Sequence, residues 1–410
     1  MNQQQTPTPS AWDRAYEFKV VALMTIGFGL VGLDRFIINP LFPVIQKELN
    51  LNYQDLGLIS GILALAWGVA SVFSGPLADR YGRMQVMVPA VLVFSLLVGT
   101  TGLATGLYSM LLVRSLMGLA EGAYVPPSIV ATIEASKPSR MGLNIGIQQM
   151  AAPFVGLGLG PVIAIALLDL LPSWRWVFLV VALPGLLLSF LIFKVMRTAG
   201  THLASPAISV PKNPPHFKDV ASLRSVWINA LVMVCLFTST IPLAVFLPNY
   251  MTDHLHFSLS TMSQMMAGLG VGSLVGTVLW PALSDKLGRK PLMLIGALVS
   301  AVCLWFLPGF TQAGIPFFLS VLLIAFMNAG VIAITIGPMT HLTTPVHLVT
   351  TATGLAVGAA EIIGGAVAPA LGGFLAEQFG IAHVLSMSLG ASVLSFLFIW
   401  VAVKEPATHH

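Results

Sequence analysis

The chain has 410 residues, of which 56% are apolar and only 8% are charged, and its mean hydropathy is +0.90. Soluble globular proteins carry roughly a quarter of charged residues, so this composition excludes that class and predicts an all-α membrane protein. The net charge of +4 is explained by the membrane topology given below, so no nucleic-acid partner is expected.

Apolar runs long enough to cross a bilayer, which takes roughly 20 residues, follow one another along the chain. The opening Met1–Ser10 is polar and has neither the basic start nor the cleavage site of a signal peptide, so the first span is expected to remain. The predicted spans are 18–45, 54–78, 84–106, 108–134, 140–168 and 174–196, and then 224–251, 260–283, 290–309, 314–340, 350–376 and 382–403.

A polar connection with several prolines divides these twelve spans into two sets of six. The expected organisation is a tail over 1–17, a bundle over 18–196, a linker over 197–223, a bundle over 224–404 and a tail with a tag remnant over 405–410.

Lysine and arginine set the orientation, because cytoplasmic flanks of membrane spans carry the excess of positive charge. With the amino terminus inside, the basic residues outside the spans are all cytoplasmic except Lys47 and Arg175. We therefore predict a monomeric, multi-pass protein in the lipid bilayer of a bacterial-type inner membrane, with both termini cytoplasmic.

One charged turn occurs twice, first over Gly75–Met84 and again over Pro281–Lys290, half a chain later. A repeat over this distance indicates two similar halves. Glycine allows the backbone to reverse, and the charged side chains can bind neighbouring helix ends. The residues expected to act in these turns during conformational change are Gly75, Asp79, Arg80, Gly82, Arg83, Asp285, Gly288 and Arg289.

The turn resembles the G-x-L-a-D-r-x-G-r-k signature between the second and third helices of major facilitator superfamily transporters. Met84 departs from the usual basic last position, whereas Lys290 does not. The resemblance implies twelve transmembrane helices in two pseudo-symmetric six-helix bundles, with a substrate site between them and alternating access.

Five ionisable side chains lie within the predicted spans, where a charge is costly and usually marks a functional site. Arg114 and Glu121 are seven residues apart and so share one helix face, roughly 10 Å from each other. The alternative is that four of them, Asp34, Arg35, Arg114 and Glu121, form buried ion pairs that only fix helix packing. The five residues are Asp34, Arg35, Arg114, Glu121 and Glu361.

Polar and aromatic side chains elsewhere in the spans could hydrogen-bond or stack on a substrate, or else only join one helix to another. Sliding the fifth span onto the eleventh superposes Gln149 on Glu361, so both are expected to face a central cavity from opposite halves. The candidate substrate-binding residues are Trp67, Tyr124, Gln148, Gln149, Asn249, Tyr250 and Asn328, together with Arg35 and Glu361.

Within the superfamily, the pattern resembles the anion:cation symporter branch, which includes sugar-acid, hexuronate and sialic-acid transporters. The residues that carry this likeness are Asp34-Arg35, Arg114-x₃-Gly118-x₂-Glu121, Gln148 and Phe246–Tyr250. The resemblance implies that Arg35 holds a substrate carboxylate and that Gln148 binds substrate. It also implies that Asp34 and Glu121, with Arg114 beside them, carry the protons.

We therefore predict a secondary active transporter that moves a small organic anion by proton-coupled symport, with the proton as coupling ion and no other cofactor or metal. An alternative is a proton-coupled exporter of drugs or lysolipids, because spinster-type transporters share the Asp-Arg pair, and Gly156–Pro161 is half of an antiporter signature. An enzyme or sensor is not predicted, because the repeated halves are typical of alternating access.

Overall fold

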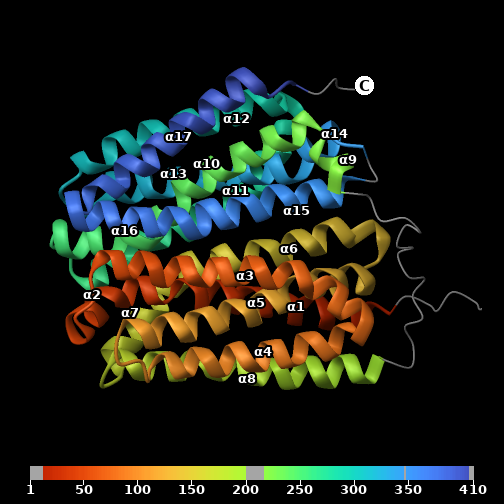
Figure 1. The fold of residues 1–410 in the computed structure, drawn as a ribbon, viewed down its shortest axis with the longest axis horizontal. Helices are drawn as coiled ribbons and strands as arrows, with labels where there is room; N and C mark the ends of the chain where they lie inside the picture. Colours follow the sequence, from red (N-terminus) through yellow and green to blue (C-terminus); the bar gives the residue numbers. More distant parts are fainter. Residues whose placement is uncertain (1–12, 200–216, 346–347, 406–410) are drawn as a thin grey trace, which may run out of the picture.

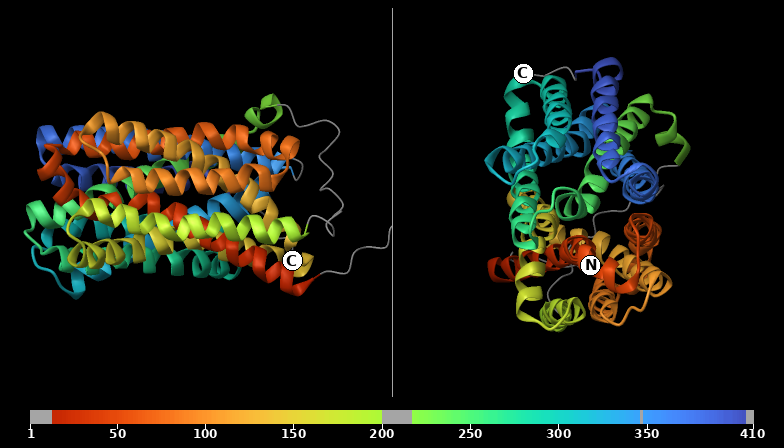
Figure 2. Two further views of the ribbon diagram at one scale, coloured as in Figure 1. Left: turned by 90° about the horizontal axis from the view of Figure 1, so that it is seen from below. Right: turned by 90° about the vertical axis from the view of Figure 1, so that its left-hand side faces the viewer.

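The computed structural model describes residues 13–199, 217–345 and 348–405. All regular structure in these residues is helical, and twelve helical segments are long and apolar enough to cross a membrane, as the sequence predicted. The predicted linker 197–223 and both predicted tails lie partly outside the described residues. Seen from one end, the spans form two groups, one from each half of the chain (Figures 1 and 2).

The first half forms the amino-terminal bundle. Its first helix begins at Arg14, four residues before the predicted span, because the Asp13 side chain accepts a hydrogen bond from the backbone N–H of Ala15 and caps the helix. The helices are α1 (Arg14–Phe36), α2 (Ile38–Leu49), α3 (Tyr53–Tyr81), α4 (Arg83–Thr101), α5 (Leu107–Ala135), η1 (Pro138–Arg140), α6 (Met141–Pro153), η2 (Phe154–Leu159), α7 (Gly160–Leu170) and α8 (Trp174–Ala199).

The second half forms the carboxyl-terminal bundle. Its elements are α9 (Phe217–Ala221), α10 (Arg224–Asn249), η3 (Tyr250–His254), α11 (Leu259–Leu287), α12 (Arg289–Phe306), η4 (Leu307–Gly309), α13 (Ile315–Ile334), η5 (Thr335–Met339), α14 (Thr340–Thr343), α15 (Val349–Ala360), η7 (Glu361–Val367), α16 (Ala368–Phe379) and α17 (Ala382–Ala402).

The repeated turns have matching backbones. Gly82 ends α3 with φ of 93°, and Gly288 ends α11 with φ of 92°, a region that side chains other than glycine rarely adopt. Each glycine N–H donates to the carbonyl four residues earlier. The two halves therefore reverse direction in the same way at equivalent places.

Several spans are not continuous α-helices. The first span is interrupted at Ile37, between α1 and α2, and wider π-turns lie within the fifth, seventh, tenth and eleventh spans as η2, η3, η5 and η7. Such turns are frequent at functional sites, and prolines or glycines at or beside them favour the irregularity. The break at Ile37 directly follows Asp34 and Arg35, and η7 begins at Glu361.

The two bundles meet at one end, which we call the distal side; the end where α1 begins and α17 ends is the terminal side, at the right of Figure 1. Packing between the bundles joins α3 to η7 and α16, α11 to η2 and α7, and α10 to α2. Gly158 and Gly270 are in backbone contact there, so that a Cβ added to Gly270 would overlap the Cα of Gly158.

The terminal side is open between the bundles. Gly142 and Gly146 on α6 have no heavy atom within 4 Å of an added Cβ, apart from their own helix, and the same holds for Gly354 and Gly358 on α15. The largest apolar core agrees with this, since it continues from the amino-terminal bundle into the distal half of the carboxyl-terminal bundle. The structure is thus closed on the distal side and open on the terminal side.

Candidate binding site between the bundles

An ion pair connects the two bundles near the middle of the first and eleventh spans. Arg35 Nη2 donates to Glu361 Oε2 at 2.7 Å and Arg35 Nη1 donates to Oε1 at 3.2 Å, so both carboxylate oxygens bind the guanidinium fork. The side chains are 15% and 8% exposed. Charge-assisted pairs with this geometry are among the stronger hydrogen bonds in proteins. Glu361 therefore lies at the level of Arg35 and contacts it across the bundle interface.

A second group of charges lies inside the amino-terminal bundle beside this pair. Arg114 Nη1 donates to the backbone carbonyl of Asp34 at 2.9 Å, just before the break in the first span. Arg35 and Arg114 both interact electrostatically with the Glu121 carboxylate. All three of Asp34, Arg114 and Glu121 are buried, with Glu121 fully inaccessible to solvent.

The protein supplies few hydrogen bonds to this group. Among the described residues, neither carboxyl oxygen of Glu121 has a hydrogen-bond partner, and the same is true of Asp34 Oδ1 and of Arg114 Nε and Nη2. An unpaired buried charge is costly, whereas a protonated carboxyl costs much less. The arrangement is therefore suited to binding and releasing a proton.

Asp253 marks the closed distal side. Its Oδ2 accepts hydrogen bonds from Gln46 Nε2 at 3.0 Å and from the Tyr53 hydroxyl at 3.0 Å, both in the amino-terminal bundle, and from Asn249 Nδ2 at 2.8 Å. Thr252 donates to the other oxygen. The predicted substrate residue Asn249 is thus engaged in a contact that closes the bundles, and Tyr250 beside it is buried and stacks on His254.

Three further predicted site residues lie inside single bundles. Gln148 accepts from Thr132 Oγ1 at 2.6 Å and donates to Ser128 Oγ at 2.9 Å. Tyr124 donates to the Met24 carbonyl at 3.4 Å, and Asn328 donates to Ser239 and Thr240. All three predicted residues are fully buried. In this conformation their polar groups join helices of the same bundle and are not brought to the Arg35–Glu361 pair.

Trp67 and Gln149 differ from these in their surroundings. Trp67 is half-buried and packs against the main apolar core. Gln149 is exposed, one turn beyond Gly146 on the same helix face that has open space beside it. It thus lies towards the terminal opening, below the level of the ion pair.

The repeated turns hold their charges in local contacts. Arg83 pairs with Glu134 at the end of α5, and Arg289 pairs with Asp285 within its own turn. Arg80 lies over the ring of Tyr81, with 5.3 Å to the centroid, and Gly75 has open space beside it. The turns are therefore on the open terminal side and make these contacts within their own bundles.

Two groups of contacts, those of Asp253 and those of Glu17, were not predicted from the sequence. Asp253 and its partners lie near the ends of spans, where charges are ordinary and carry no signal. Glu17 was placed in the tail, but it is buried, and accepts from the backbone N–H of Lys137, from Arg140 and from Asn144. It fastens the start of α1 to the loop before α6. The spacing of these residues in the sequence gives no hint of this contact.

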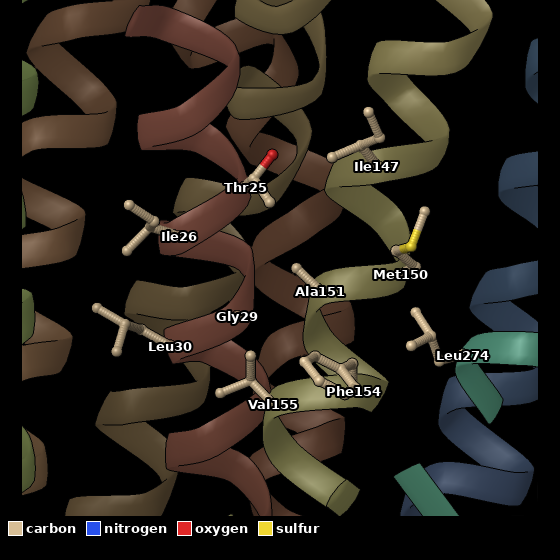
Figure 3. Close-up of a pocket in the computed structure, with 10 residues that line it drawn as sticks. All are labelled: Thr25, Ile26, Gly29, Leu30, Ile147, Met150, Ala151, Phe154, Val155 and Leu274. Carbon is tan, nitrogen blue, oxygen red and sulfur yellow. The ribbon is translucent and has the colours of Figure 1, made fainter. Parts of the chain in front are cut away.

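A groove of about 410 Å³ lies elsewhere, between α1 and the fifth span. Its lining is apolar, and Figure 3 shows Ile26 and Leu30 on α1, Met150 and Phe154 on the neighbouring fifth span, and Leu274 approaching from the other bundle. A second groove of about 450 Å³ shares Thr25, Ile26 and Ile147 with it and reaches Arg14 at the terminal end. Neither groove is lined by the ion pair.

Two helical bundles that enclose intramembrane charges, closed at one end and open at the other, are typical of polytopic transport proteins. The sequence profile of the Major Facilitator Superfamily matches residues 24–246 and 230–410. The chain therefore belongs to the Major Facilitator Superfamily.

Curated relatives include transporters named for organic acids. The chain is 26% identical to the sialic acid transporter NanX of Escherichia coli, over 68% of each chain. It is also 26% identical to the hexuronate transporter of Bacillus subtilis, over 75% of this chain and 71% of the relative. The identity to the gentisate transporter of Corynebacterium glutamicum is 26%, over 95% and 89%.

The fold is similar to that of a bacterial homologue of the human lysosomal transporter Spinster, solved in an inward-facing and unoccupied conformation. The TM-score is 0.81 at 17% identity, and the match covers 95% of this chain and 97% of the other. This likeness shows the fold.

Proposed function

We propose that the protein is a secondary transporter that carries a small organic carboxylate together with protons across a bacterial inner membrane. The observation that carries this proposal is the Arg35 fork, which binds a carboxylate between the bundles. The names of the relatives support an organic acid as substrate, since all three are anions at neutral pH. The distribution of basic residues supports cytoplasmic termini, so the open side faces the cytoplasm.

The assignment of roles follows from charge and burial. Arg35 anchors the substrate carboxylate through two charge-assisted hydrogen bonds. Glu121, with Asp34 and Arg114 around it, is the proton-coupling group, because its carboxyl is buried without a hydrogen-bond partner among the described residues. Opening and closing of the bundles changes what surrounds this group, which allows a proton to be taken up on one side and released on the other.

The test is uptake into proteoliposomes of radiolabelled glucuronate, gentisate and N-acetylneuraminate, with and without an inwardly directed proton gradient. We expect at least one of them to be accumulated only with the gradient. Glucose serves as an uncharged control. Uptake of every carboxylate that ignores the gradient would contradict proton coupling, and the absence of any carboxylate transport would contradict the substrate class.

A second candidate is an exporter of lysolipids or apolar drugs. It is favoured by the two adjoining grooves beside α1, the first with an apolar lining and the second reaching the charged residues Arg14, Glu17 and Arg140 at the terminal end. An amphiphile with one chain and an anionic head has this distribution of polarity. Transfer of a fluorescent lysophospholipid across the membrane of the same proteoliposomes would favour this candidate over the first.

A further inference from the structure

The guanidinium of Arg35 binds the carboxylate of Glu361 through two hydrogen bonds, and it could bind any other carboxylate in the same way. Each carboxylate oxygen faces one terminal nitrogen, and the two residues come from different bundles. Glu361 is thus bound in the way proposed above for the substrate. The pairing was not expected from the sequence, from which Glu361 was predicted to face the cavity and bind substrate.

The surroundings leave little room beside this pair. A Cβ built on Gly365, one turn after Glu361, would lie 2.6 Å from Glu361 Oε2 and 3.3 Å from Arg35 Nη2. Even a methyl group would crowd the two charged groups. Bringing a second carboxylate to the same nitrogens would also place two negative charges against one positive charge in a buried site, which is unfavourable.

Resting on the proposed function, we propose that Glu361 is an internal substitute for the substrate carboxylate. It binds Arg35 in the empty transporter, is displaced when a carboxylate substrate binds, and takes up one proton from the open aqueous side as it is released. The substrate class is thereby restricted to anions that can displace a carboxylate from arginine.

Release of Glu361 needs the proton because, among the described residues, its carboxylate pairs with Arg35, and Arg114 is already engaged with Asp34 and Glu121. The elements packed against η7 are α3, α10, α15 and α16. The charged residues of α3 lie near its ends, Glu377 of α16 lies at the distal end, and α15 has none. On α10 Phe237 packs against Gly364, and the charged residue Arg224 is the first residue of the helix, at the terminal end. Glu121 faces Arg35 from the other side and adds negative charge. A released carboxylate would therefore be left buried and unpaired, which is costly.

The experiment measures binding of radiolabelled glucuronate and gentisate to the purified protein in nanodiscs between pH 5.5 and 8. Displacement coupled to uptake of one proton makes the affinity fall as the pH rises, by up to about tenfold per pH unit. In Glu361→Gln we expect the pH dependence to be reduced by the contribution of one proton, leaving that of Glu121, and the affinity to be at least about tenfold tighter than wild type at pH 7.5. Glu377→Gln makes the same change in the same span, where an amide oxygen can still accept the Tyr53 N–H, and should follow the wild-type profile.

An infrared difference spectrum provides a direct readout. Adding gentisate to the wild type should produce a carbonyl band from newly protonated carboxyls, and the component due to Glu361 should be missing in Glu361→Gln. Weaker binding by Glu361→Gln at every pH, or an unchanged pH profile, would overturn the proposal while leaving an Arg35-dependent carboxylate transporter in place. Equal binding by wild type and Arg35→Gln would overturn the proposed function, and this inference with it.

Discussion

Arginine and lysine carry the same charge but offer a carboxylate different geometry. Arg35 uses two terminal nitrogens at once, which a lysine ammonium cannot do. Loss of one charge-assisted hydrogen bond costs roughly 1.5–3 kcal/mol, so Arg35→Lys should bind gentisate at least about tenfold more weakly than wild type. Arg175→Lys, which changes a distal arginine paired with Glu48, is the control. Wild-type affinity in Arg35→Lys would mean that Arg35 only holds the bundles together.

A substitution of Glu121 tests whether this residue couples proton movement to substrate transport. An amide has the shape of a neutral carboxyl but cannot release a proton, so Glu121→Gln should keep exchange of substrate across the membrane and lose accumulation driven by a proton gradient. Both are measured in the same proteoliposomes, so exchange is the internal control for folding. Accumulation that survives in this variant would move the coupling role to Asp34.

The sequence could indicate the charged residues of the site because a charge in an apolar run is visible without knowing the fold. The positions of neutral polar residues in the sequence did not show which of them belong to the site. Gln148 and Asn328 find hydroxyl partners on neighbouring helices, and these pairings depend on how the helices pack. The role of Asp253 could not be predicted because carboxylates are common near the ends of spans. Its role follows only from its partners in the other bundle, Gln46 and Tyr53.

At the scale of helices, hydropathy located every span, but it could not locate the breaks within them. Helix interruption at Ile37 and the π-turn at Glu361 depend on local backbone pairing, which average apolarity does not record. The break lies two residues after Arg35, and the π-turn begins at Glu361. The part of the site that was hardest to predict is therefore the backbone beside the two charges.

Close backbone contact on the distal side gives a prediction about glycine. A methyl group at Gly270 would overlap the backbone of Gly158. Backbone atoms cannot rotate out of the way as a side chain can. Gly270→Ala should therefore disfavour distal closure and shift the protein towards the state closed on the terminal side. Gly354→Ala, in open space, should not.

The measurement is double electron–electron resonance spectroscopy, which gives the distances between pairs of spin labels. Spin labels on cysteines introduced at the exposed positions Tyr81 and Leu342 report the opening of the terminal side, with Cys235 and Cys303 replaced by serine. Shorter distances are expected in Gly270→Ala and a wild-type distribution in Gly354→Ala. An unchanged distribution in both would show that the Gly158–Gly270 contact does not set the conformational equilibrium.

Asp253 gives a second prediction for the distal side. Asp253→Ala removes the acceptor shared by Gln46 and Tyr53, so the contact between bundles should weaken and the distal side should open more often. Labels at the exposed positions Tyr108 and Phe379 should then show a population of longer distances. Asp169→Asn, an exposed carboxyl change on α7, is the control and should leave the distances unchanged.

For the whole molecule, the repeated turn was enough to predict two similar halves, and the structure has the expected twelve helices. The conformational state could not be predicted. Alternative states of a transporter differ by a few kcal/mol, and the same sequence must be compatible with each of them. The packing of Gly57, Gly61 and Gly270 against the opposite bundle, with open space at Gly354, shows which side is closed.

The ion pair between the bundles also bears on membrane voltage. Arg35 with Glu361 is neutral, and Arg35 with a bound carboxylate beside a protonated Glu361 is neutral too, so the electric field does no work on this pair in either form. Removing the Glu361 charge leaves Arg35 uncompensated in the empty protein. Moving one charge through the whole field costs about 2.3 kcal/mol per 100 mV, and Arg35 crosses part of it.

Glu361→Gln should therefore acquire voltage dependence at this step. With an inside-negative potential set by potassium and valinomycin, net uptake by the variant should slow relative to wild type, because it requires return of the positively charged empty form. Exchange, which does not pass through the empty form, should be unaffected. A variant whose net uptake ignores the imposed potential would show that Arg35 does not move through the field, and the balance of charge in this pair would then serve binding alone.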